Sequence, residues 1–173
     1  MHNLRFPFLF LFCLAIASAQ AQRSILATDS LCVTGAVKNP AVFTIQALDT
    51  FTKVPVPDQI IYNHSGEIKD TLRRLLGVPL KKVLAPVRYD YDKPRTLNEF
   101  YFVFVASDGY KVVCSWNEIY NTSVGDSFYI ITGMENKKLK DMDQRIVFLS
   151  TADLKTGRRY IKGLKTIEVH RAN

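Results

Sequence analysis

The sequence predicts a single β-rich α+β domain, and three observations support this fold class. The chain has 173 residues, 47% of them hydrophobic, which suits one domain with one core. Short runs of β-branched and aromatic residues recur along it, bounded by Gly, Pro, Asn and Asp, as strands joined by turns require. No repeat, low-complexity tract or linker interrupts this pattern. Few segments have helical spacing, so strands should make up most of the domain.

Phe100–Ala106 is the strongest expected strand, because it is β-branched or aromatic nearly throughout, and we expect it to be buried on both faces. The turn Ser107-Asp-Gly109 should join it to Tyr110–Trp116 as a hairpin. The other expected strands are Leu31–Val37, Val42–Ile45, Gln59–Tyr62, Phe128–Thr132, Arg145–Leu149 and Leu164–Val169.

Helical structure is expected only in short pieces. Gln46–Phe51 fits a helical turn, and Pro79–Leu84 fits a short helix with proline in its first turn. Residues 67–76 fit a helix or a strand equally well, because their apolar positions match both periods. Gly77 is expected to end that element.

Residues 1–21 are expected to form an export signal. Arg5 is the one charged side chain there, Phe6–Ile16 is apolar apart from Pro7, and small residues with Ala19 or Ala21 as the cleavage position follow. The apolar run is too short and wrongly flanked for a membrane span. We therefore expect export to the periplasm or the cell exterior in an unfolded form. Residues 22–30 would then be a polar lead-in and residues 31–170 the domain, with no membrane span after signal removal.

The net charge of +7 is spread along the chain, with no basic arm, so no nucleic-acid partner is expected. The mature chain would hold two cysteines, Cys32 and Cys114, in an oxidising compartment. They could form one disulfide or remain two buried thiols, and their spacing does not decide between these alternatives.

Several motifs stand in a recognisable order along the chain. They are Val33-Thr-Gly-Ala-Val-Lys-Asn-Pro40, Gly77-Val-Pro-Leu-Lys-Lys-Val-Leu84, Ala106-Ser-Asp-Gly-Tyr-Lys-Val-Val113 with Trp116-Asn-Glu-Ile119, Arg145-Ile-Val-Phe148, and Gly157-Arg-Arg-Tyr-Ile-Lys-Gly-Leu-Lys-Thr-Ile-Glu-Val169. Together they resemble the oxidoreductase molybdopterin-binding domain of the sulfite-oxidase-like family, in its short exported form. The resemblance spans roughly Leu31–Val169 and implies a mixed-sheet α+β fold around a pterin pocket.

The resemblance also implies a cysteine thiolate that binds molybdenum, and this sequence departs from it there. The ligand should follow the strand Gln59–Tyr62 and precede Gly77, but no cysteine lies between Cys32 and Cys114. Asn63 and His64 stand near the expected ligand position instead. We therefore assign no catalytic residue and no metal ligand, and expect no bound cofactor, although the resemblance leaves molybdopterin possible.

Basic residues near the chain's end match the family's phosphate-holding positions. Arg145 matches an arginine before the penultimate apolar strand, and Lys162 matches a lysine that helps to hold the pterin phosphate; Arg158 and Arg159 add positive charge beside it. The alternative for Arg158–Lys162 is a strand with an ordinary solvated face.

These residues predict a non-catalytic binding module whose inherited pocket, formed by Asn63, His64, Arg145, Arg158, Arg159 and Lys162, binds a small anionic ligand or an exported protein partner. The alternative is a molybdopterin-dependent oxidoreductase with a non-thiolate metal site near Asn63 or His64. A third reading is a structural or interaction module without a pocket.

Overall fold

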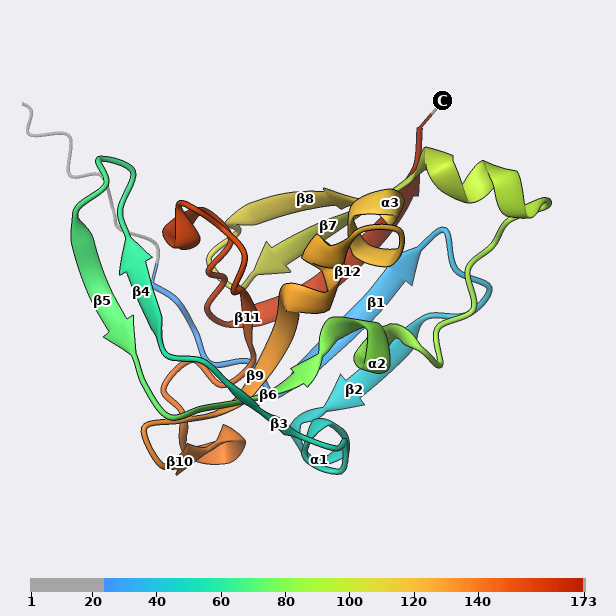
Figure 1. Cartoon of the computed structure of the whole chain (residues 1–173). Coiled ribbons are helices and arrows are strands. Elements are labelled where there is room, and N and C mark those ends of the chain that lie inside the picture. Colours follow the sequence, from blue (N-terminus) through green and yellow to red (C-terminus); the bar gives the residue numbers. More distant parts are fainter. Residues whose placement is uncertain (1–23, 173) are drawn as a thin grey trace, which may run out of the picture.

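Residues 24–172 are described by the computed structural model, which consists of two five-stranded sheets and a separate two-stranded hairpin. Figure 1 shows the hairpin standing to one side of the two sheets. The molecule is β-rich with mixed strand directions and few helices, which confirms the predicted class at that level.

The first sheet has the order β2 (Ala41–Thr44), β1 (Ser30–Gly35), β12 (Leu164–Arg171), β7 (Phe100–Ala106) and β8 (Lys111–Ser115). β1 and β12 run parallel, whereas the other neighbours are antiparallel, so this sheet is mixed. The parallel pair joins the first and the last strand of the described residues, with Cys32 opposite Thr166.

The second sheet is antiparallel and has the order β10 (Lys137–Lys138), β9 (Phe128–Met134), β6 (Leu75–Pro79) and β3 (Val54–Val56), with β11 (Val147–Ser150) also paired to β9. The hairpin consists of β4 (Gln59–Tyr62) and β5 (Ile68–Leu72).

The main core lies between the two five-stranded sheets. Phe100, Phe102 and Phe104 of β7 are at most 1% exposed, and the Phe104 ring stacks on Phe148 of β11 with centroids 4.5 Å apart. A second cluster, including Ile61, Leu72 and Leu149, connects the base of the hairpin to the second sheet. Ile61 and Leu72 of the hairpin are therefore at most 3% exposed.

The helices are short and occur at strand ends. α1 (Ile45–Asp49) begins where Thr44 Oγ1 accepts a hydrogen bond from Ala47 N at 3.1 Å, and α3 (Trp116–Tyr120) begins where Ser115 Oγ accepts one from Glu118 N at 3.0 Å. The remaining helical segments are α2 (Leu80–Leu84), η1 (Pro94–Glu99), η2 (Ser123–Ser127), η3 (Leu139–Asp141) and η4 (Thr156–Arg158). No helix within residues 24–172 combines the length and apolar character needed to cross a membrane.

Several expected boundaries are confirmed, and others are wrong. β4 and β7 have the expected bounds, and residues 67–76 adopt the strand alternative as β5 and the start of β6. Gly77 does not end an element but lies within β6. Glycine suits this position because a Cβ there would lie 3.0–3.3 Å from side chains of β3 and β9. β7 is fully buried on one face only, because alternate residues are half-exposed. Trp116 begins α3 instead of ending β8.

The expected strand Arg145–Leu149 begins two residues later, at Val147. Arg145 has a φ of 52°, in the left-handed region, so it cannot continue the strand backward.

The expected export signal lies outside the described residues, while the described part of the lead-in rests on the domain. Thr28 forms a parallel bridge to Arg145, and Ile45 N donates to Asp29 O at 2.9 Å. Leu26 pairs with Ser107 through its N–H and its carbonyl, at 2.9 and 2.8 Å.

Cys32 and Cys114, the two cysteines among residues 24–172, are free thiols. Cys32 lies on β1 and Cys114 on β8, with β12 and β7 between them. Adjacent strands lie about 4.8 Å apart, so the two Cα atoms are too distant for a disulfide. The structure therefore favours the alternative of two thiols.

Candidate functional site: a cation-lined cavity

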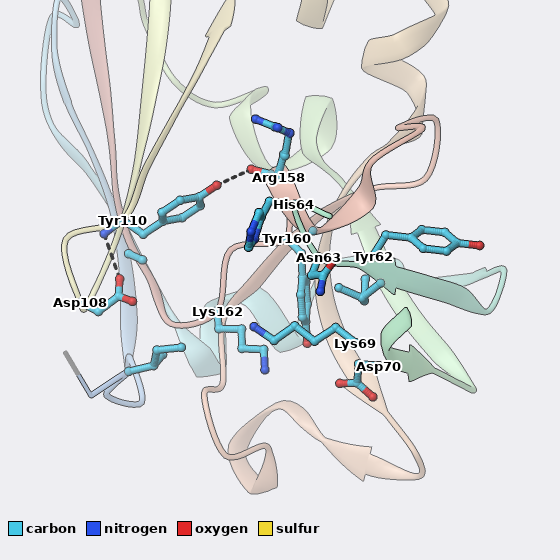
Figure 2. A pocket seen from close by; sticks show the side chains of 14 residues that line it. Tyr62, Asn63, His64, Lys69, Asp70, Asp108, Tyr110, Arg158, Tyr160 and Lys162 are labelled. Atoms are coloured by element: carbon cyan, nitrogen blue, oxygen red, sulfur yellow. Dashed lines mark hydrogen bonds between the residues drawn. The ribbon is translucent and has the colours of Figure 1, made fainter. Parts of the chain in front are cut away.

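A cavity of about 470 Å³ opens between the β4–β5 hairpin, the segment from Gly157 to Lys162, and the turn that joins β7 to β8. Figure 2 shows these three parts of the chain around it. Ile25, from the segment that precedes β1, adds an apolar side chain to the lining.

The tip of the hairpin is held in shape by Asn63. Its Oδ1 accepts hydrogen bonds from the backbone N–H groups of Ser65 and Glu67, both at 2.9 Å, and its Nδ2 donates to Glu67 Oε2 at 2.8 Å. These bonds occupy most of the capacity of the amide, so Asn63 shapes the turn. The neighbouring His64 is exposed and stands at the cavity rim.

The hairpin and η4 form one continuous wall. Thr156 Oγ1 donates to Ile60 O at 2.6 Å and accepts from Tyr62 N at 3.2 Å, although it lies far from both in sequence. Gly157 passes so close to β4 that a Cβ atom would lie 2.1 Å from Tyr62 O. Only glycine permits this approach, which brings the following residues to the cavity.

The opposite wall is connected to η4 by Tyr110. Its hydroxyl donates to Arg158 O at 2.6 Å, and its backbone N–H donates to Asp108 Oδ1 at 2.9 Å. The hydroxyl end of the ring is therefore held by Arg158 O and the backbone of Tyr110 by Asp108, while 44% of the residue remains exposed.

Lys69 and Lys162 supply positive charge inside the cavity. In Figure 2 the two side chains extend toward the same space from opposite walls, whereas the guanidinium of Arg158 points away from it. Lys162 Nζ lies 5.2 Å from the centroid of the Tyr160 ring. Burial raises the pKa of Tyr160, and the nearby charge of Asp70 raises it further, so this phenol stays protonated.

Arg159 lies outside the cavity, in an ion cluster that we call the Arg159 cluster, formed with Asp153, Glu118 and Cys114. Its Nε and Nη2 donate to the two carboxylate oxygens of Asp153 at 2.7 and 2.6 Å, and Nη1 contacts Glu118. Nη1 also lies 3.9 Å from Cys114 Sγ. The two carboxylates raise the pKa of Arg159 above its ordinary value and balance its charge.

Arg145 also lies away from the cavity, where it pairs with Asp29. The structure thus brings four of the six predicted residues, Asn63, His64, Arg158 and Lys162, to one cavity and directs Arg145 and Arg159 to carboxylates elsewhere. Sequence reasoning missed Lys69, Tyr110 and Tyr160 as lining residues. The strand alternative for residues 67–76 was the available signal, since a strand there continues the hairpin that carries Asn63 and His64 and places Lys69 on it.

The residues present do not fit a molybdenum cofactor bound through a thiolate. Cys32 and Cys114 do not line the cavity, and Cys114 is 1% exposed. Burial, together with the charge of Glu118, raises the pKa of the Cys114 thiol to about 12, so it is a poor source of thiolate. Among residues 24–172, no three His, Cys, Asp or Glu side chains gather into a potential metal site.

Comparisons with known proteins bear on the fold only. No family model matches the chain, and no curated protein matches it. Its structure is similar to the sulfane dehydrogenase SoxCD from Paracoccus pantotrophus, with a TM-score of 0.58 and 14% sequence identity. The match covers 82% of this chain and 38% of the SoxCD chain, so this protein spans well under half the length of that relative. The similarity shows a distant fold relationship.

Proposed function

We propose that the protein is an exported module with a sulfite-oxidase-like molybdopterin-binding fold that binds a small anionic ligand without catalysing a reaction. The observation that carries this proposal is the convergence of Lys69 and Lys162 on one cavity. The distant fold relationship to the sulfane dehydrogenase supports the fold part of the proposal.

The electrostatic argument rests on which charges already have partners. Among the described residues, neither the Lys69 nor the Lys162 ammonium forms an ion pair with a carboxylate. Two carboxylates, Asp70 and Asp108, also line the cavity, and they accept hydrogen bonds from Thr71 N at 2.8 Å and from Tyr110 N at 2.9 Å. A bound anion would receive charge-assisted hydrogen bonds from both lysines in a partly enclosed space. The enclosure favours a small ligand over a protein partner that presents an acidic side chain.

Isothermal titration calorimetry with inorganic phosphate, sulfate and acetate tests the proposal. Lys162→Ala and Lys69→Ala should each weaken binding roughly 5- to 20-fold, because each removes one charge-assisted hydrogen bond. Lys82→Ala is the matched control, since Lys82 is exposed on α2 and does not line the cavity. Equal affinities for Lys162→Ala and Lys82→Ala would overturn the proposal, as would no binding of any of the three anions at millimolar concentration.

The alternative is a molybdopterin-dependent oxidoreductase with a non-thiolate site, which the ordered motifs and the fold relationship favour. The donor set around the cavity disfavours it. Elemental analysis of protein purified from its native host separates the two. Molybdenum near one atom per chain establishes the alternative, and a His64→Ala variant that loses this metal would locate it.

Export is the remaining part of the proposal. Fractionation of cells that produce the full chain should place the protein outside the cytoplasm, shortened at Ala19 or Ala21. Deletion of residues 2–21 should leave it in the cytoplasm. Cytoplasmic location of the full chain would contradict export.

A further inference from the structure

We propose that the anion bound in this cavity carries a flat aromatic body, as an aromatic carboxylate does. This inference rests on the proposed function and names the ligand class for the same site. It predicts that the acid group binds between Lys69 and Lys162 and that the ring lies against the aromatic side chains of the wall.

Cavity size is the first observation. A volume of about 470 Å³ exceeds what a single tetrahedral oxyanion fills. It falls in the range of about 300–1,000 Å³ that is typical of pockets for organic ligands. In Figure 2 the two ammonium groups lie below the rings of Tyr110 and His64, so a ligand held between the lysines can extend toward those rings.

The chemistry of the wall is the second observation. Besides the two lysines, the cavity is lined by the rings of Tyr110, Tyr160 and His64 and by the aliphatic residues Ile25, Ile61 and Ala106, and the Tyr160 ring lies next to the Lys162 ammonium. Figure 2 shows the His64 ring between Tyr110 and Tyr160. Aromatic side chains favour stacked and edge-to-face contacts with another ring, in addition to the burial of apolar surface.

Preorganisation of the rings is the third observation. The Tyr110 hydroxyl is bound to Arg158 O at 2.6 Å, so the ring is held in place while nearly half of the residue stays exposed. The turn that carries His64 is fixed by the three hydrogen bonds of the Asn63 amide. A ring that is already fixed loses little conformational freedom on binding, which favours a rigid flat ligand.

Titration with three monocarboxylates tests this inference. Benzoate and cyclohexanecarboxylate have the same charge and similar size, but only benzoate is flat and aromatic, while acetate has the acid group alone. Benzoate should bind roughly 3- to 10-fold more tightly than cyclohexanecarboxylate, as expected for one or two aromatic contacts. Acetate should bind most weakly.

The outcomes separate the two proposals. Equal affinity for benzoate and cyclohexanecarboxylate would overturn the aromatic body and leave anion binding intact, provided that Lys162→Ala weakens both. If Lys162→Ala changes neither affinity, the proposed function itself fails.

Two substitutions at Tyr110 locate the contact. Tyr110→Phe keeps the ring and removes the hydrogen bond to Arg158 O, whereas Tyr110→Leu removes the ring as well. The preference for benzoate should survive in Tyr110→Phe and fall to about 1- to 2-fold in Tyr110→Leu. A preference that persists unchanged in Tyr110→Leu would overturn the assigned ring contact. Circular dichroism and thermal unfolding of each variant verify that it is folded before titration.

Discussion

Arg159 and Lys162 lie three residues apart in one basic segment, yet they have opposite surroundings. Arg159 is balanced by Asp153 and Glu118 and lies 5.0 Å over the ring of Phe128. Lys162 faces an open cavity, and its ammonium contacts the ring of Tyr160. One basic side chain of the segment therefore joins a buried ion cluster, and the other presents its charge to the cavity. Whether a basic side chain is available to a ligand thus depends on the carboxylates that surround it in the folded protein, and its position in the sequence does not reveal them.

The largest expected effect comes from breaking the Arg159 cluster. Arg159→Ala leaves Asp153, whose side chain is 9% exposed, without its cation. We expect a loss of about 3 kcal/mol in the free energy of unfolding, because a buried charge is left unpaired. Urea denaturation measures it, with Lys162→Ala as the comparison, expected within about 0.5 kcal/mol of wild type. Equal losses of unfolding free energy in Arg159→Ala and Lys162→Ala would contradict the claim that Arg159 stabilises the fold and Lys162 does not.

The second effect tests how the cavity wall is assembled. In Gly157→Ala the new methyl group meets Tyr62 O, so β4 and η4 must separate. We expect a loss of about 2 kcal/mol in unfolding free energy, as is usual for overpacking, together with weaker anion binding. Thermal unfolding and phosphate titration report the two changes. A stable variant with unaltered affinity would show that the wall tolerates the separation.

The third effect concerns Cys114 in the Arg159 cluster. Burial raises the pKa of its thiol from 9.0 to about 12, so between these values the folded chain keeps a proton that the unfolded chain releases. The unfolding free energy should therefore fall as pH rises above 9, by up to about 1.4 kcal/mol per pH unit for this proton.

Denaturation between about pH 8.5 and pH 11 measures this slope. Cys114→Ala should reduce it, and the buried tyrosines, whose pKa values are also raised, account for the slope that remains. Cys32→Ala is the matched control for losing a sulfhydryl group from the same sheet. An unreduced slope in Cys114→Ala would exclude the thiol as its source.

The smallest effect is expected at Arg145. Its ion pair with Asp29 is largely exposed, with 72% of the Asp29 side chain accessible. Arg145→Ala should therefore lower the unfolding free energy by less than about 1 kcal/mol and leave anion affinity unchanged. Weakened phosphate binding in this variant would return Arg145 to the list of ligand-binding residues.

The fold class could be predicted from the sequence because the strongest strands are continuous runs of aromatic and β-branched residues. β7 is a run of aromatic and β-branched residues, and its bounds follow directly. β3 was missed, and β6 was expected only up to Leu76 as one of two alternatives, since Pro55, Gly77 and Pro79 are typical of turns. Pro79 stands at the last position of its strand, and Gly77 is required by close packing, and neither fact is visible before the sheets are assembled.

Part of the site was predictable from the resemblance to the molybdopterin-binding family, which marked a position after Gln59–Tyr62 and a phosphate-holding lysine at Lys162. Asn63 and His64 line the same cavity as Arg158 and Lys162, although the two pairs lie far apart in sequence. Tyr110 reaches the site through a hydrogen bond across 48 residues of sequence, which no local pattern encodes. The ion pairs of Arg159 with Glu118 and Asp153 likewise depend on the folded structure and could not be read from the sequence.

The position of β12 has a kinetic consequence. This strand lies between β1 and β7, so the first sheet stays in two separate halves until Leu164–Arg171 has been synthesised. Pairing of strands so distant in sequence slows folding, because the intervening chain must close a long loop first. A chain that has not yet been extended through Leu164–Arg171 therefore lacks the strand that joins the two halves of the first sheet, and its β1 and β7 edges stay unpaired on that side.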